Sequence, residues 1–152
     1  MKSLSLLASA TLVAFSMTAG VAAAADPDDV INYRKQVMEV VGANTTALGL
    51  IAQGKVPHEE SFLAHAEMLA QAATLTKAAF RENTAGKGRE KTTAKPDVWK
   101  DWAKFEKGLD KLEAQSAELA KLASTGGMKA AAPQLRDLFR TCKDCHDDYR
   151  TK

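Results

Sequence analysis

Apolar residues recur at steps of three, four and seven through most of this chain, the spacing of one face of an α-helix. The alternation of apolar and polar residues that predicts a β-strand does not continue over four or more residues. No internal repeat is visible in the sequence. The pattern therefore predicts an all-α fold, an antiparallel up-down-up-down four-helix bundle with short or moderate connections.

Capping residues, prolines and glycines predict where these helices begin and end. Asp26 followed by Pro27 is a strong start for the first helix, which is expected to end near Gln53. The second helix is expected close to residues 58–80. Residues 81–95 are rich in Gly, Thr, Lys and Asn and lack an apolar period, so they predict an exposed loop.

The third and fourth helices fill the rest of the chain. Pro96 begins the third, and Thr125–Gly127 ends it. Its apolar seam suits bundle packing and consists of Val98, Trp102, Phe105, Leu109, Leu112 and Leu119. A stripe on the fourth helix consists of Leu135, Leu138, Cys142, Cys145 and Tyr149. We expect Pro133 near the first turn of this helix, because proline inside a helix costs about 3 kcal/mol.

The segment Cys142–His146 reads Cys-Lys-Asp-Cys-His, the C-x-x-C-H spacing of covalent c-type haem attachment. Two thiols one helical turn apart can form thioethers with the two vinyl groups on one side of a porphyrin. The imidazole that follows them can face the iron. Because Cys142 and Cys145 stand where core leucines would otherwise stand, we expect one covalent haem c in the bundle core, with His146 as an iron ligand.

Other uses of this cysteine pair fit the sequence less well. A redox dithiol of the thioredoxin kind needs a βαβ pattern, and a zinc site needs a second pair of ligands; both are missing from the sequence. A structural disulfide within one turn is the remaining alternative. None of these uses calls for a histidine directly after the second cysteine, so haem attachment is the favoured interpretation.

Residues 1–25 have the pattern of a cleaved secretory signal peptide. Lys2 provides the positive start, residues 4–17 an apolar stretch and residues 23–25 a small-residue cleavage site. The apolar stretch is interrupted by Ser and Thr and is shorter than the roughly 20 residues that span a bilayer. We therefore expect a periplasmic mature domain over residues 26–152, in which recurring charges argue against membrane insertion.

The charge balance bears on the kind of partner. The chain has 21 Lys and Arg against 19 Asp and Glu, a formal net charge of +2. Recognition of nucleic acid usually needs a strongly basic face. We therefore expect no nucleic-acid partner.

The second axial position of the iron has one main candidate, Met38 in the first predicted helix. It stands four residues after Arg34 and hence on the same helical face. A thioether can ligate haem iron, but methionine also packs as a flexible core residue over an open site. His58 and His65 are weaker candidates, and the residues alone leave ligation by Met38 open.

Three segments give the chain a family resemblance. They are Tyr33–Met38, the Pro-x-x-Trp start at Pro96–Trp99, and the terminal motif Cys142–His146 followed by Asp147–Arg150. With the leader, they make the chain similar to class II cytochromes c over all of residues 26–152. That family contains the high-spin cytochromes c′, with an open distal site, and the low-spin cytochrome c-556 type, with a methionine on the iron.

The resemblance also implies roles for particular residues. Met38 matches the distal position, and residues 48–57 resemble the low-spin branch, whereas Tyr33 and Arg34 are common in the high-spin one. On balance the resemblance favours His146 and Met38 as the two axial ligands. It further places four residues near the haem, its propionates or the proximal histidine: Arg34, Thr93, Lys95 and Arg150.

The function implied by this resemblance is a periplasmic, non-enzymatic electron carrier that exchanges single electrons with redox partner proteins. The alternative is a five-coordinate, high-spin cytochrome c′ that binds nitric oxide or carbon monoxide. The distal acid–base pair of a peroxidase is not evident in the sequence. Relatives in this family form dimers, so a homodimer is a further expectation.

Overall fold

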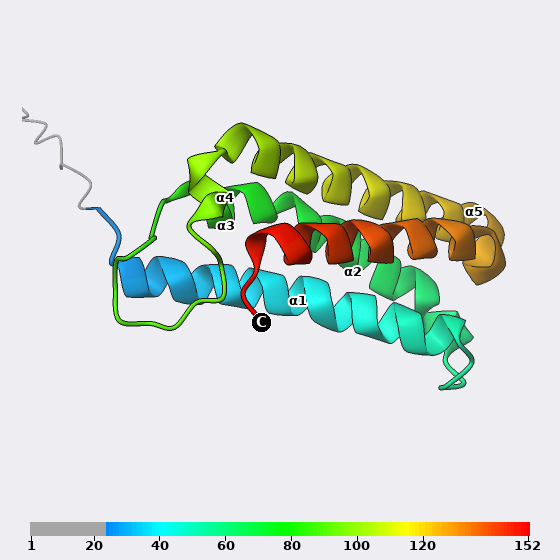
Figure 1. The fold of residues 1–152 in the computed structure, drawn as a ribbon. Helices are drawn as coiled ribbons and strands as arrows, with labels where there is room; N and C mark the ends of the chain where they lie inside the picture. Colours follow the sequence, from blue (N-terminus) through cyan, green and yellow to red (C-terminus); the bar gives the residue numbers. More distant parts are fainter. Residues whose placement is uncertain (1–23) are drawn as a thin grey trace, which may run out of the picture.

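The computed structural model describes residues 24–152 as a bundle of long helices (Figure 1). The elements along the chain are α1 (Pro27–Ala52), a 3₁₀ turn η1 (Glu59–Ser61), α2 (Phe62–Thr74), α3 (Thr76–Arg81), α4 (Asp97–Lys100) and α5 (Trp102–Tyr149). No strand occurs among these described residues, and the predicted all-α four-helix bundle is confirmed. The predicted signal peptide falls almost entirely on residues 1–23, which lie outside the described part.

α5 is two helices joined by a sharp turn. Gly127 has φ 66° and ψ −171°, a backbone conformation that interrupts the helix and that glycine adopts without a steric penalty. The chain reverses there, so the two halves of α5 run side by side in opposite directions (Figure 1). The prediction that Thr125–Gly127 ends the third helix is confirmed.

The ends of α1 also follow the sequence prediction. The Asp26 side chain accepts a hydrogen bond of 2.8 Å from the backbone N–H of Asp28, and Pro27 occupies the first turn. Such a cap pairs one of the N–H groups that a helix start leaves free. At the other end Gln53 caps the helix, and Gly54 follows with a positive φ of 64°.

The fourth helix begins earlier than the sequence predicted. It continues directly from the turn at Gly127, so Pro133 lies in its second turn instead of its first. Proline has no N–H, and the helical bond to the carbonyl of Lys129 is therefore missing. The prediction was wrong because the tight turn leaves no linker, and burial of Ala131 at 0% exposure fixes this stretch against the core.

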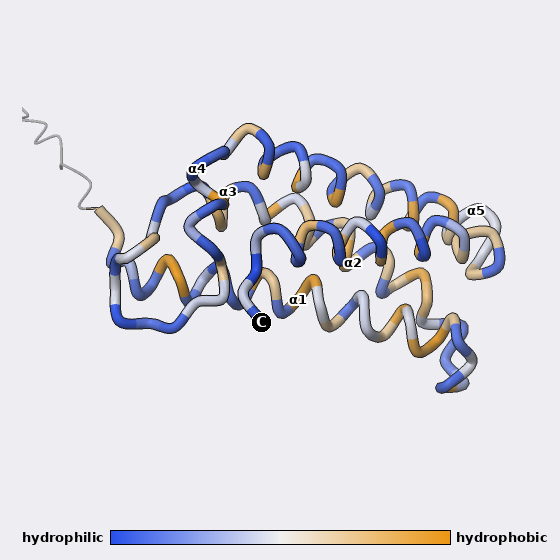
Figure 2. Tube along the Cα trace, viewed as in Figure 1, coloured by the Kyte–Doolittle hydropathy of each residue, from blue (hydrophilic) through white to orange (hydrophobic). Residues whose placement is uncertain are grey.

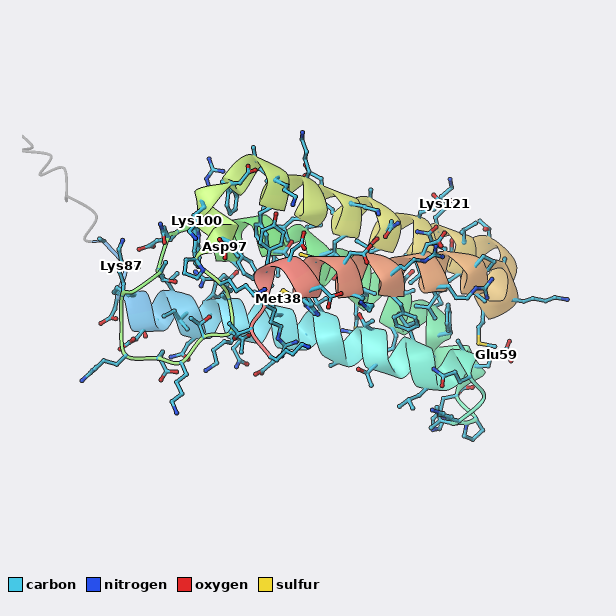
Figure 3. The ribbon with its side chains drawn as sticks, viewed as in Figure 1. Met38, Glu59, Lys87, Asp97, Lys100 and Lys121 are labelled. Carbon is cyan, nitrogen blue, oxygen red and sulfur yellow. The ribbon has the colours of Figure 1, made fainter. Side chains whose placement is uncertain are left out.

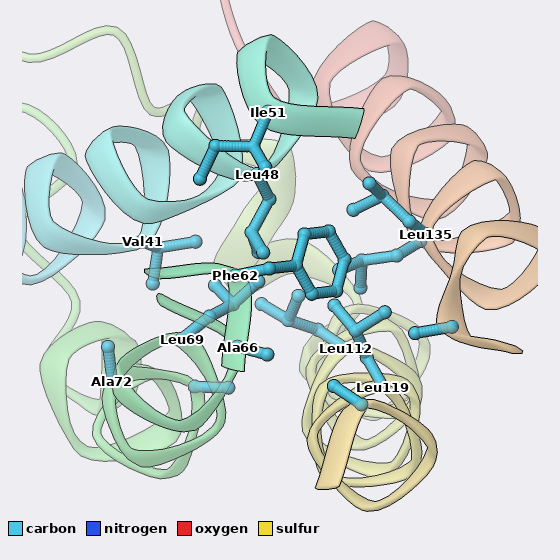
Figure 4. Close-up of a cluster of buried hydrophobic side chains, with 14 residues drawn as sticks. Val41, Leu48, Ile51, Phe62, Ala66, Leu69, Ala72, Leu112, Leu119 and Leu135 are labelled. Atoms are coloured by element: carbon cyan, nitrogen blue, oxygen red, sulfur yellow. The ribbon is translucent and has the colours of Figure 1, made fainter. Parts of the chain in front are cut away.

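The buried core forms two clusters along the bundle. Figure 2 shows apolar residues recurring turn by turn along each helix. The larger cluster joins side chains from α1, α2 and both halves of α5, as Figure 4 shows. The smaller one lies at the other end and contains Val37, Ala79, Phe80, Val98, Phe105 and Leu109. Burial at these positions supplies the main favourable term in folding.

Truncation of Leu69 tests this core. Leu69 on α2 is 0% exposed, and we expect Leu69→Ala to lower the free energy of unfolding by about 2–5 kcal/mol through lost burial and a cavity. Leu75, 47% exposed just after α2, is the matched control, and Leu75→Ala should change stability by no more than about 0.5 kcal/mol. Urea unfolding followed by circular dichroism measures both. Equal losses in the two variants would contradict this description of the core.

Candidate functional site

A cavity of about 520 Å³ lies among α1, both halves of α5 and the loop before α4. This volume is within the roughly 300–1,000 Å³ typical of ligand pockets. Most of its wall is apolar and consists of Met38, Val41, Phe80, Val98, Phe105, Leu109, Leu112 and Tyr149. Gly42 also lines it, and a side chain built there would meet nothing within 4 Å. The cavity therefore reaches the backbone of α1.

Cys142, Cys145 and His146 all line this cavity from the last turns of α5. Both thiols are free and half-buried. Burial raises the pKa of Cys142, and burial together with the neighbouring Cys142 raises the pKa of Cys145 to about 11. Thiols of this kind are protonated at neutral pH, which does not favour a reactive redox dithiol.

A metal site built from side chains alone is not found here. Within residues 24–152 no group of three or more His, Cys, Asp and Glu side chains could hold a metal ion. Zinc is usually held by four ligands, or by three and a water. The half zinc site considered from the sequence therefore lacks its second half in the described structure.

His146 is suited to bind iron through a neutral ring. Burial lowers the pKa of His146, and the positive charge of Arg150 lowers it further. The neutral imidazole is the form that ligates metals. The backbone N–H of Arg150 donates to the His146 carbonyl over 3.0 Å, so the histidine stands in the last hydrogen-bonded turn of α5.

Met38 lies on α1 and reaches the same cavity. It packs against both core clusters, and Figure 3 shows it between α1 and the C-terminal half of α5. Gly42 stands one turn further along the same face of α1 and leaves space beside it. The structure thus brings Met38 and His146 to one cavity from different helices.

Arg34 also lines the cavity, but its guanidinium is engaged elsewhere. The residue is 2% exposed, and its N–H groups donate to three oxygens: Ala79 O at 3.0 Å, Thr84 Oγ1 at 3.0 Å and Glu82 O at 3.1 Å. The same guanidinium lies over the rings of Phe80 and Trp99. Its contacts thus tie α1 to α3 and the segment that follows α3. The place near the haem and its propionates that the resemblance implied for Arg34 stays a prediction.

The other predicted residues divide into two groups. Thr93 and Arg150 line the cavity, beside the bridge between Ala94 and Arg150. Lys95 is not part of the cavity wall. Its ammonium instead donates to backbone carbonyls at the end of α5.

Sequence reasoning missed several residues around the cavity. Lys35 and Lys91 line it, and Lys35 pairs with Glu90 at 3.3 Å. Gly108 lies where an added Cβ would be 4.0 Å from the Cys145 sulfur. A glycine inside a helix costs about 1 kcal/mol relative to alanine. Gly108 stands three residues after Phe105 and four before Leu112, hence beside the apolar seam on the same helical face. A glycine at that place was a usable signal that space is needed beside the motif.

The residues present fit a covalently bound haem. Two free thiols and a neutral imidazole reach one apolar cavity, the donor set that thioether attachment and one axial ligand need. Cationic side chains lie among the lining residues and suit the carboxylates of a porphyrin. Together with the four-helix bundle, this site defines a c-type haem protein.

Comparisons with known proteins identify the family. A family model described as Cytochrome C′ matches residues 29–150. A cytochrome c′ of Rhodospirillum rubrum is 35% identical over 141 residues, which cover 93% of this chain and 94% of the relative. One of Pararhodospirillum photometricum is 34% identical, with 83% and 99% covered. The chain belongs to the cytochrome c′ family.

Solved structures agree with this assignment. A cytochrome c′ from Shewanella frigidimarina aligns with a TM-score of 0.75 at 25% identity, covering 84% of this chain and 98% of that one. A nitrosyl complex of a variant from Alcaligenes xylosoxidans aligns with a TM-score of 0.72 at 26% identity and the same coverage.

The family assignment bears on two predictions from the sequence. Members of this family bind one covalent c-type haem, so the predicted cofactor is confirmed. The relatives named above are cytochromes c′, and the low-spin cytochrome c-556 assignment is not confirmed.

The described helices also bear on membrane association. Between residues 24 and 152, no helix combines the length and the apolar character needed to cross a bilayer.

Proposed function

We propose that this chain is a haem c protein that binds nitric oxide or carbon monoxide. When bound, the haem would supply an iron that can take up a diatomic gas. The observation that carries the proposal is the cavity wall on α1, where the partly buried Met38 packs against both core clusters and Gly42 leaves open space. Solved relatives described as nitric oxide complexes support it.

The chain's own residues have separate tasks in this proposal. Cys142 and Cys145 would hold the haem, and His146 would offer its ring nitrogen to the iron. Met38 and Val41 keep water from the wall on α1, because their side chains are apolar and packed against the core. A diatomic gas has little charge and suits such a wall.

This proposal departs from the function that the sequence favoured. Ligation by both His146 and Met38 with an electron-carrier role was the first interpretation, and gas binding was the alternative. The relatives support the alternative better, since structures among them are described with nitric oxide bound. Single-electron exchange with redox partner proteins stays a prediction, as does a non-enzymatic role.

Two further predictions also stay open to test. A periplasmic location rests on the leader, which lies outside the described residues. A homodimer is consistent with large apolar side chains that are exposed on two adjacent helices, Tyr33 and Val40 on α1 and Met68 on α2. Size-exclusion chromatography with light scattering tests the homodimer.

Truncation of Met38 tests the gas-binding proposal. If Met38 only covers the site, Met38→Ala should keep the spin state of the native protein. It should also speed carbon monoxide association by about tenfold, which corresponds to a barrier lower by about 1.4 kcal/mol. Stopped-flow absorption of the reduced protein measures the rate.

The exposed methionine Met68 supplies the control. It is 44% exposed on α2, so Met68→Ala should leave the rate unchanged. A low-spin native spectrum that becomes high-spin in Met38→Ala would instead mean that Met38 ligates the iron, and the electron-carrier interpretation would return.

A further inference from the structure

The end of α5 carries a specific arrangement of hydrogen bonds. A helix leaves its last four carbonyls without intrahelical partners. Here the His146 carbonyl accepts from the backbone N–H of Arg150 at 3.0 Å. The next three carbonyls, those of residues 147–149, all accept from one residue, Lys95.

Lys95 donates hydrogen bonds to these carbonyls from both its side-chain ammonium and its backbone N–H. Its Nζ donates to Asp147 O and to Asp148 O, each at 3.0 Å. Its backbone N–H donates to Tyr149 O at 2.9 Å. A cation at the C-terminus of a helix also interacts favourably with the helix dipole. Lys95 is therefore the cap of the turn that begins at His146.

The position of Lys95 is itself fixed by the chain around it. The Thr151 N–H donates to Thr93 O at 2.8 Å, and Ala94 pairs with Arg150 in an antiparallel bridge. Pro96 follows and restricts Lys95 to extended backbone. Figure 1 shows this segment passing from the N-terminal half of α1 back to the C-terminus of the chain.

The loop before this segment is anchored at its far end. The Asp28 carboxylate on α1 accepts from the backbone N–H groups of Arg89 and Glu90. The Glu90 side chain pairs with Lys35 of α1. Lys95 thus extends from a loop that is held on α1, and it can hold the end of α5 in place.

From this geometry we propose that Lys95 is a positioning residue for His146. It does not line the cavity and acts through the turn it caps. Uncapped helix ends fray, and fraying here would free the imidazole to change its orientation. The inference rests on His146 as an axial ligand in the proposed function, but it does not depend on gas binding.

Lys95→Met tests the inference, with Lys104→Met as its matched control. Lys104 pairs with the Asp148 side chain of the same turn at 3.5 Å and caps no carbonyl. Both variants remove one positive charge beside that turn. In the purified haem-loaded protein, we expect Lys95→Met to speed hydrogen exchange of amides 146–151 by about tenfold or more. Lys104→Met should leave that exchange rate nearly unchanged.

A second measurement separates positioning from simple capping. Electron paramagnetic resonance of the oxidised protein reports the symmetry around the iron. We expect the g-values to become more widely distributed in Lys95→Met, because the orientation of the His146 ring then varies, and to stay unchanged in Lys104→Met. Lys95→Arg, which keeps the cation, should restore the native signal.

Two results would overturn the inference. One is similar exchange in the two methionine variants, and the other is faster exchange with an unchanged iron signal. A different result would contradict the proposed function, namely that the native protein does not bind carbon monoxide.

Discussion

Replacing both Cys142 and Cys145 by serine is expected to abolish covalent haem attachment. Both sulfur atoms line the cavity beside His146, and a serine hydroxyl does not form the thioether that a thiol forms with a vinyl group. After denaturing electrophoresis, the haem stain should fall to background. Intact-protein mass spectrometry should show the mass of the polypeptide alone.

Thr141 provides the control for that experiment. It lines the same cavity and is 7% exposed, but it carries no thiol. Thr141→Ser should therefore keep the full haem stain. A stain that survives in the double serine variant would contradict haem attachment at this motif, whereas loss in both proteins would indicate a general defect in folding.

Replacing Arg34 by methionine is expected to destabilise the fold by about 3 kcal/mol or more. The change removes the donor from three acceptors, the carbonyls of Ala79 and Glu82 and the hydroxyl of Thr84. A buried acceptor left without a partner costs about 1–3 kcal/mol. Contacts of the guanidinium with two aromatic rings are lost as well. Urea unfolding of the purified protein measures the change.

Lys35 is the matched control for Arg34. It is the next residue on α1, it also carries one positive charge, and its ion pair with Glu90 is about two-fifths exposed on each side. Exposed pairs of this kind contribute at most about 1 kcal/mol. Lys35→Met should therefore change stability little. Equal losses of stability in the two variants would contradict the claim that the buried hydrogen bonds of Arg34 stabilise the fold.

The fold could be predicted largely because local signals mark the helix ends. Asp26 and Pro27 at one helix start and Gly127 at the sharp turn each have a conformational reason that is readable without a structure. The prediction for Pro133 was wrong because the cost of proline inside a helix was used to place the start of the fourth helix close to it. The turn at Gly127 leads directly into the helix, so the helix begins before Pro133 and lacks one backbone hydrogen bond at that residue.

The site could be predicted where its residues are close in sequence. Cys142, Cys145 and His146 follow from spacing alone. The contacts of Arg34 and Lys95 join residues 45 and 52 positions apart, respectively. Such contacts depend on how helices pack, and no local pattern encodes them. Arg34 lines the cavity and Lys95 does not. Arg34 donates to two backbone carbonyls and the Thr84 hydroxyl, whereas Lys95 donates to backbone carbonyls at the end of α5. Their role beside a haem stays a prediction.

The role of Met38 marks another limit of the sequence. Residues 48–57 resembled one branch of the family, and Tyr33 and Arg34 resembled the other. Whether a thioether binds iron depends on its placement in the cavity, which helical spacing does not determine. Solved relatives that are described as nitric oxide complexes support the proposed gas-binding role.

The absorption spectrum of the purified protein, with and without carbon monoxide, tests the central claim most directly. The proposed function predicts broad high-spin bands in both oxidation states and a clear change when carbon monoxide is added to the reduced protein. A sharp low-spin spectrum that carbon monoxide leaves unchanged would contradict it, and would instead support an electron carrier with His146 and Met38 on the iron.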